Sequence, residues 1–187
     1  TDLESLHREH RELAARVARL EGQVRDASAQ DAVTLCVFSN ELDRLLAAFS
    51  IANSSAACGM RVTMFFTFWG VTVLKREGAE APGKTLVERL FGRMLVGGPV
   101  ARRLSKLELG GIGRWMIRRE MRRKGIADLA EQIGMAKETG VEFLACGMSM
   151  DLMGIRQAEL MDYPNLRTCG ATQFIDVAAR GNVTLFI

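Results

Sequence analysis

The chain has 187 residues, of which 48% are hydrophobic, and a formal net charge of +3 at pH 7. This length favours one globular domain with an accessory element, and the hydrophobic content is sufficient for a buried core. The longest apolar run, residues 62–74, is shorter than the ~20 residues that a membrane-spanning helix needs, and Gly70 interrupts it. The run is better explained as a buried strand followed by a loop.

Basic residues concentrate in the middle of the chain. Residues 75–124 contain 14 Lys and Arg against 5 Asp and Glu, a local net charge of +9, so the remainder sums to −6. Such a segment can bind phosphates, acidic proteins or anionic lipid, and a solvated helix face is the simpler interpretation.

Four cysteines occur, at positions 36, 58, 146 and 169, without any CxxC pair. The two histidines, His7 and His10, fall in the predicted N-terminal helix, so no zinc pattern is formed and we expect no metal. Gly110-x-x-Gly113 lacks the preceding strand of a dinucleotide site, and we expect no cofactor. No export signal is recognised, which predicts a cytoplasmic protein with reduced thiols.

Residues 1–30 are predicted to form a heptad helix. Leucines recur every seven residues on one seam and a second seam alternates with it, at Leu6, Leu13 and Leu20 and at Leu3, His10, Val17 and Val24. The pattern favours a coiled-coil arm for self-association, and the alternative is a single amphipathic helix that packs on its own domain.

Residues 31–187 are predicted to form an α/β domain. It begins with a βαβ unit of strand 32–38, helix 41–57 and strand 61–66, with Ser39 or Asn40 as the helix cap. Short connections predict parallel strands and a right-handed crossover.

A basic helical insertion of about residues 78–125 follows. Helices are predicted at 86–95, 115–124 and 126–139, and the apolar run 141–146 is the third strand. A short helix at 148–153, another near Glu159, a helix at 171–179 and a terminal strand at 183–187 complete the chain.

The predicted architecture is a small doubly wound parallel sheet of four or five strands, with helices on both faces. We expect the strand order 2-1-3-4, which places the switch point between the first and third strands. Cys146, at the end of the third strand, should then lie beside the turn from Ser39 to Asp43.

Three strings, FSNELDRLLAAF, AACGMRVTMFFTFWG and LACGMSMDLMGI, and a terminal LFI resemble the DsrE/DsrF-like group of sulfur-relay proteins. The resemblance runs from about Asp31 to Ile187 and leaves the heptad segment outside. It implies a small doubly wound fold, assembly into homo- or hetero-oligomers, and TusA-like or rhodanese-like proteins as partners. In sulfur-relay members a cysteine after the third or fourth strand accepts sulfane sulfur as a persulfide, and Cys146 matches that position. The string YPNLRTCGATQFI departs from the expected glycine-rich one and introduces Cys169.

Persulfide chemistry requires an accessible thiolate, so the pKa of Cys146 must fall from its usual ~8.5. A helix that starts at Gly147 would stabilise the anion, and an Arg or Lys of the basic segment would do the same. The alternative is that Cys146 is a small buried hydrophobic residue. Cys169 is either a resolving or relay thiol for Cys146 or an incidental loop cysteine.

Further residues are candidates for substrate binding at the same edge of the sheet. Each also has a structural interpretation, such as helix capping for the polar residues and core or interface packing for Trp69 and Met148. The candidates are Ser39, Asn40, Asp43, Trp69, Gly147, Met148 and Ser149.

Two hypotheses of function follow. The first is an intracellular sulfur carrier or sulfurtransferase that holds sulfane sulfur on Cys146. The alternative is a non-catalytic ligand-binding or scaffold protein, peripheral to a membrane through the basic helix around Trp115. Little aromatic interleaving in that helix argues against nucleic acid as a partner.

Overall fold

The computed structural model describes residues 2–27, 30–84, 104–106 and 109–187, so the helix predicted at 86–95 lies outside the described residues. The chain forms two compact units, Thr1–Gln30 and Asp31–Ile187. The first unit contains helix α1, Asp2–Ala27, on which Leu13, Val17 and Leu20 are exposed.

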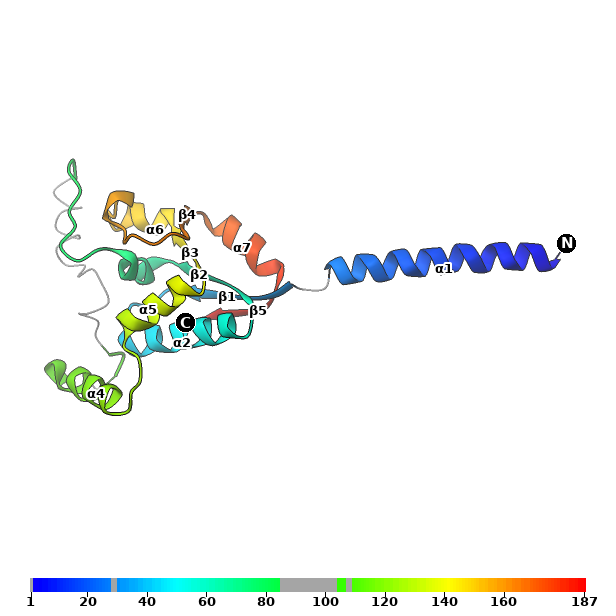
Figure 1. Ribbon diagram of the computed structural model, residues 1–187. Helices are drawn as coiled ribbons and strands as arrows, with labels where there is room; N and C mark the ends of the chain where they lie inside the picture. Colours follow the sequence, from blue (N-terminus) through cyan, green and yellow to red (C-terminus); the bar gives the residue numbers. More distant parts are fainter. Residues whose placement is uncertain (1, 28–29, 85–103, 107–108) are drawn as a thin grey trace. The chain divides into compact units, whose positions relative to one another are not determined.

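The second unit alternates strands and helices along the chain (Figure 1). Its strands are β1 Gln30–Val37, β2 Arg61–Phe66, β3 Glu142–Cys146, β4 Leu166–Cys169 and β5 Gly181–Phe186. Its α-helices are α2 Leu42–Ala57, α4 Ile112–Arg123, α5 Leu129–Glu138, α6 Gly147–Leu152 and α7 Ala171–Ala179. Short 3-10 helices are η1 Phe68–Leu74, η2 Leu109–Gly111 and η3 Gln157–Glu159. No helix in these described ranges is long and apolar enough to cross a membrane.

The five strands form one sheet in the order β4-β3-β2-β1-β5. The pairs β1–β2, β2–β3 and β3–β4 are parallel, which confirms the predicted α/β class. The predicted order 2-1-3-4 is wrong, because β2 lies between β1 and β3. Strands β2, β3 and β4 are added in turn on one side of β1, and β5 lies on its other side. Apolar runs identify buried strands but carry no information about which strands are neighbours.

Strand β4 was not predicted as a strand. It is short and its pattern is irregular, since Arg167 and Thr168 are exposed and only Cys169 is buried. Cys169 therefore lies at the end of a strand, opposite Cys146 in the register, and not in a loop.

Helices cover both faces of the sheet, with α2 and α5 on one face and α7 on the other (Figure 1). The larger core lies under α2 and α5 and includes Phe49, Phe66 and Phe143. The smaller core lies under α7 and consists of Cys36, Phe65, Leu144, Cys146, Cys169 and Phe174. Three of its six members are thiols, whereas the larger core is built from aliphatic, aromatic and methionine side chains.

The segment after β2 crosses the end of β1. Gly70 donates its N–H to the carbonyl of Phe38 over 3.2 Å, and a Cβ at Gly70 would overlap with the carbonyl oxygen of Val37. Phe68 adopts a positive φ of 44°, which is uncommon for a residue with a Cβ and often accompanies a functional turn. Residues 67–69 are thereby held at the carboxyl edge of the sheet.

Two carboxylates of the α/β unit bind the residues on either side of the undescribed range 85–103. Glu159 is buried and forms ion pairs with Lys84 at 2.6 Å and Lys75 at 3.9 Å. Asp43 accepts hydrogen bonds from the N–H of Ser105, over 2.9 Å, and from its hydroxyl. Lys84 and Ser105, on either side of the undescribed range, are therefore held against the rest of the α/β unit.

Candidate functional site

Cys146 is the last residue of β3 and the N-cap of α6. Its neighbours β2 and β4 end at Phe66 and Cys169, so three carboxyl ends meet at this edge of the sheet. Ligand sites of open parallel sheets form at such an edge. The backbone turns directly from strand into helix at Gly147, which brings the first turn of α6 next to the sulfur of Cys146.

Ser149 links α6 to the end of β2. Its side chain is fully buried, its Oγ accepts the N–H of Phe68 over 2.9 Å, and it lies 3.0 Å from the Oγ1 of Thr67. The Ser149 hydroxyl thus holds the turn after β2 through its oxygen, and its own O–H can donate a further hydrogen bond.

The environment of Cys146 favours its thiolate. Burial alone would raise the pKa of this thiol, but hydrogen bonds from the hydroxyl and N–H of Ser149, the hydroxyl of Thr67 and the N–H of Met148 outweigh that effect. The pKa of Cys146 consequently lies below its ordinary value. Donors that stabilise the charged form of an acid always act in this direction.

The expectation that the Cys146 thiol is accessible requires correction. The thiol is only 3% exposed, because β3 runs between two other strands and α7 covers this face. The sequence also suggested an Arg or Lys of the basic segment beside the sulfur, and part of that segment lies outside the described residues. Among the described residues, neutral hydroxyl and backbone donors in the first turn of α6 and in the turn after β2 lower the pKa of Cys146.

The other two thiols of this face have raised pKa values. Burial raises the pKa of Cys36 to about 11, and the charge at Cys146 adds to the effect. Burial also raises the pKa of Cys169, again with a contribution from Cys146, and Arg167 opposes it. Cys146 is therefore the thiol of the cluster that ionises first.

The remaining predicted residues divide into two groups. Gly147, Met148 and Ser149 lie beside Cys146 in α6, and Trp69 lies in the turn after β2. Ser39, Asn40 and Asp43 are separated from Cys146 by β2, so the sheet does not bring them to the thiol.

These three polar residues have structural partners. The N-cap of α2 is Glu41, so the predicted cap at Ser39 or Asn40 is wrong. Ser39 accepts the N–H of Glu41, Asn40 donates to Thr72, and Asp43 binds Ser105.

An apolar rim surrounds the carboxyl edge. We use this name for five exposed side chains, Phe38, Phe68, Trp69, Met148 and Leu152. They follow the ends of β1, β2 and β3, and hydrogen bonds from Gly70 to Phe38 and from Phe68 to Ser149 join the three turns. Exposed apolar groups gathered at one edge are typical of a protein-binding surface.

Thr67 belongs to the candidate site and was not among the residues that the sequence suggested. It is buried, touches Ser149 and lowers the pKa of Cys146. Its place directly after the apolar strand 61–66 was the available signal, since Cys146 also ends a strand.

Comparison with known proteins identifies the family of the chain. Residues 29–186 match the model of the DsrE/DsrF/DrsH-like family. The chain belongs to this family. The resemblance noted in the three sequence strings is thereby confirmed, and the match covers all five strands.

Two curated relatives and one solved structure are similar to this DsrE-like chain. It is 38% identical to the uncharacterized protein YrkE of Bacillus subtilis over 154 residues, which are 82% of this chain and 95% of the relative. It is 27% identical to the sulfur carrier protein DsrE2 of Allochromatium vinosum over 164 residues, 84% of this chain and 99% of the relative. The fold is similar to that of the ychN protein from E. coli, with a TM-score of 0.50 at 10% identity over 84% of this chain and 99% of that one.

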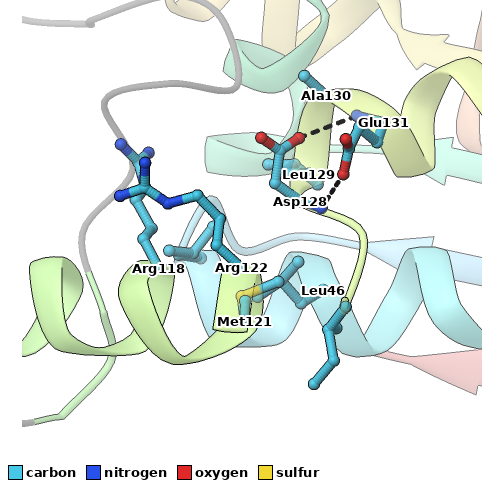
Figure 2. Close-up of a pocket in the computed structure, with 10 residues that line it drawn as sticks. Leu46, Arg118, Met121, Arg122, Asp128, Leu129, Ala130 and Glu131 are labelled. Atoms are coloured by element: carbon cyan, nitrogen blue, oxygen red, sulfur yellow. Dashed lines mark hydrogen bonds between the residues drawn. The ribbon is translucent and has the colours of Figure 1, made fainter. Parts of the chain in front are cut away.

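This DsrE-like domain also has a cavity of about 310 Å³ that does not include Cys146. It lies between α2, α4 and α5, where Arg118 and Arg122 extend side by side and Asp128 and Glu131 cap α5 through reciprocal hydrogen bonds (Figure 2). Its floor is apolar, with Leu42, Leu46, Met121 and Leu129. Among the described residues, no group of three or more His, Cys, Asp or Glu side chains is suited to hold a metal ion.

Proposed function

We propose that this chain is a sulfur-relay protein that carries sulfane sulfur as a persulfide on Cys146. The observation that carries the proposal is the set of hydrogen-bond donors on the Cys146 thiolate, in a member of the DsrE/DsrF/DrsH-like family. The similarity to a protein named as a sulfur carrier supports the same role. A reducing compartment such as the cytoplasm suits this chemistry, since the four cysteines are unpaired.

The transfer step is a thiol–persulfide exchange. The Cys146 thiolate attacks the outer sulfur of a donor persulfide, the sulfur–sulfur bond of the donor breaks, and the donor leaves as a thiolate. The product is a persulfide on Cys146, and delivery to an acceptor thiolate reverses the step. The hydrogen-bond donors of Ser149, Thr67 and Met148 stabilise the Cys146 thiolate. This thiolate is the nucleophile when sulfur is loaded and the leaving group when sulfur is delivered.

Because Cys146 is only 3% exposed, a donor of any size reaches its sulfur only after the groups that cover it move. We propose that a sulfur donor or acceptor, of the TusA-like or rhodanese-like kind, docks on the apolar rim. Met148 belongs to this rim and is 62% exposed, and its backbone N–H donates a hydrogen bond to the Cys146 sulfur, so a partner bound at the rim lies one residue from the thiol.

Mass spectrometry tests the proposal directly. The purified chain is incubated without oxygen with glutathione persulfide, and the intact mass is measured at once. We expect an adduct of about 32 Da, one sulfur atom, that is absent from Cys146→Ser and retained in Cys58→Ser. Cys58 is the matched control because it is exposed and lies outside the thiol cluster. An adduct that persists in Cys146→Ser, or none in the wild type, refutes the assignment.

The surface of α4 favours a second candidate function, peripheral binding to a membrane. Ile112, Trp115 and Met116 are exposed, and Arg119 lies over the Trp115 ring at 5.4 Å. Arg122 and Arg123 follow on the same helix. Apolar and cationic side chains on one helix are characteristic of binding to anionic lipid.

Co-sedimentation with vesicles tests this second candidate. We expect binding to vesicles that contain phosphatidylserine, weaker binding to neutral vesicles, and a loss of binding in Trp115→Ala. Trp69→Ala is the matched control, since Trp69 is similarly exposed but lies on the apolar rim. Equal binding of wild type and Trp115→Ala contradicts a role for α4.

A further inference from the structure

Cys146 and Cys169 are register partners on adjacent parallel strands. Neighbouring strands lie about 4.8 Å apart, and directly paired residues project to the same face of the sheet. Disulfides join residues whose Cα atoms are about 4.4 to 6.8 Å apart. The backbone of β3 and β4 therefore places two thiols within bonding reach of each other.

Both thiols belong to the same small core. Cys146 is 3% exposed and Cys169 is 7% exposed, and both pack with Leu144 and Phe174. Cys36 is in this core as well, but it lies on β1 opposite Phe65, so β2 separates it from Cys146. Of the two other thiols in this core, Cys169 is thus the one on the strand next to Cys146.

The two partners differ in charge state. Hydrogen bonds lower the pKa of Cys146, whereas burial and the neighbouring charge raise the pKa of Cys169. Cys146 is consequently the thiolate that receives sulfur while Cys169 remains protonated. After loading, the negative charge moves to the outer sulfur of the persulfide and farther from Cys169, which makes ionisation of Cys169 easier.

We infer that Cys169 resolves the persulfide on Cys146 and releases sulfide, leaving a disulfide between β3 and β4. The inference rests on the proposed function and extends it from carriage of sulfane sulfur to its intramolecular reduction. Glu142 and Arg167, an ion pair between the same two strands, hold the strands together at the far end of the pair.

The resolving step is balanced without an external oxidant. The Cys169 sulfur attacks the Cys146 sulfur, the bond from Cys146 to the outer sulfur breaks, and the Cys169 proton leaves with that sulfur as hydrogen sulfide. The outer sulfur is reduced to sulfide while the two thiol sulfurs are oxidised to a disulfide. A dithiol reductant restores the two thiols for the next cycle.

The test follows the chain after loading. Wild type and Cys169→Ser are loaded with glutathione persulfide without oxygen, the donor is removed by gel filtration, and intact mass and free sulfide are measured over time. In the wild type we expect the adduct of about 32 Da to convert into a species about 2 Da lighter than the reduced chain, with about one equivalent of sulfide. In Cys169→Ser we expect the adduct to persist without sulfide release.

Controls separate this inference from the proposed function. Cys36→Ser removes another buried thiol of the same core and should behave as the wild type. A stable adduct on wild-type Cys146 with no lighter species overturns the inference but leaves sulfur carriage intact. Sulfane sulfur found by peptide mapping on Cys169 shows relay and also overturns it. No adduct in either wild type or Cys169→Ser refutes sulfur carriage itself. The wild-type measurement requires no variant to fold.

Discussion

At the scale of single residues, the ionisation of Cys146 depends on neutral hydrogen-bond donors. The sulfur of Cys146 is buried, yet Ser149, Thr67 and Met148 together outweigh the desolvation of its thiolate. Neutral donors suit the proposed role of Cys146, in which its thiolate both attacks and leaves, because they add no permanent charge that would hold the anion in place.

Removal of the Ser149 hydroxyl should raise the pKa of Cys146. Cys146 is an acid whose pKa is lowered in the folded chain, so loss of a donor moves its ionisation to higher pH. We expect Ser149→Ala to slow persulfide loading at pH 7 by roughly three- to tenfold. The check is a pH titration of thiolate absorbance, with Cys146→Ser to identify the signal. An unchanged midpoint in Ser149→Ala would show that this hydroxyl does not stabilise the thiolate.

A methyl group at Gly70 should destabilise the carboxyl edge. The added Cβ would overlap with the carbonyl oxygen of Val37, whereas Gly134 in α5 has no atom within 4 Å of an added Cβ. We expect Gly70→Ala to lower the free energy of unfolding by about 2 to 4 kcal/mol. The matched change Gly134→Ala should be neutral or stabilise by about 1 kcal/mol. Denaturant unfolding compares the two, and equal stability would contradict the close approach.

At the scale of elements, sequence patterns predicted the positions of three buried strands but not the order of the strands in the sheet. The runs at 32–38, 61–66 and 141–146 each form a strand, and residues 33–37, 62–66 and 143–146 within them are buried on both faces of the sheet. The string LRTC has no such run, because edge strand β4 buries only its last residue. Strand order depends on where each crossover helix packs, and residue spacing does not encode this.

The part of the candidate site that is local in sequence could be predicted, and the part that depends on strand order could not. Cys146, Gly147, Met148 and Ser149 are consecutive, so one local pattern identified them together. Thr67 and Cys169 come from other strands and reach the site only through the order of the sheet. The polar turn at Ser39 was assigned to the site because β3 was expected beside β1.

Helix α1 gives a prediction at this scale. Its described side chains at Leu13, Val17 and Leu20 are exposed, which fits the proposal of a self-associating arm. We expect Leu13→Glu to lower the molar mass measured by light scattering to that of a smaller assembly. Ala15→Glu adds the same charge off the seam and should leave the mass unchanged. An identical mass for wild type and Leu13→Glu would exclude α1 as the association surface.

At the scale of the whole molecule, two exposed apolar surfaces are separate in sequence and in place. The apolar rim follows the ends of β1, β2 and β3, at the sheet edge where Cys146 also lies, and the face of α4 lies in the basic segment of residues 75–124. In the two proposals the apolar rim binds the sulfur donor and the face of α4 binds lipid. A substitution in one surface should therefore abolish one kind of binding and leave the other unchanged.

Transfer from a protein donor should depend on the rim alone. We expect Trp69→Ala to slow sulfur transfer from a persulfidated rhodanese-like protein by about tenfold, because an exposed aromatic anchor is lost. Loading from glutathione persulfide should stay unchanged, since a small donor needs no docking surface. Trp115→Ala should behave as the wild type with both donors. Equal slowing with both donors would instead indicate damage to the thiol site.

The buried contacts at Lys84 and Ser105 have a consequence for how this chain can vary. Glu159 and Asp43 hold Lys84 and Ser105 against the rest of the α/β unit, on either side of residues 85–103. We therefore expect a chain with a different or shorter segment between these two residues to keep the strands that position Cys146. Chains that differ only in this segment should then share the same candidate thiol while they differ in the surface that the segment presents.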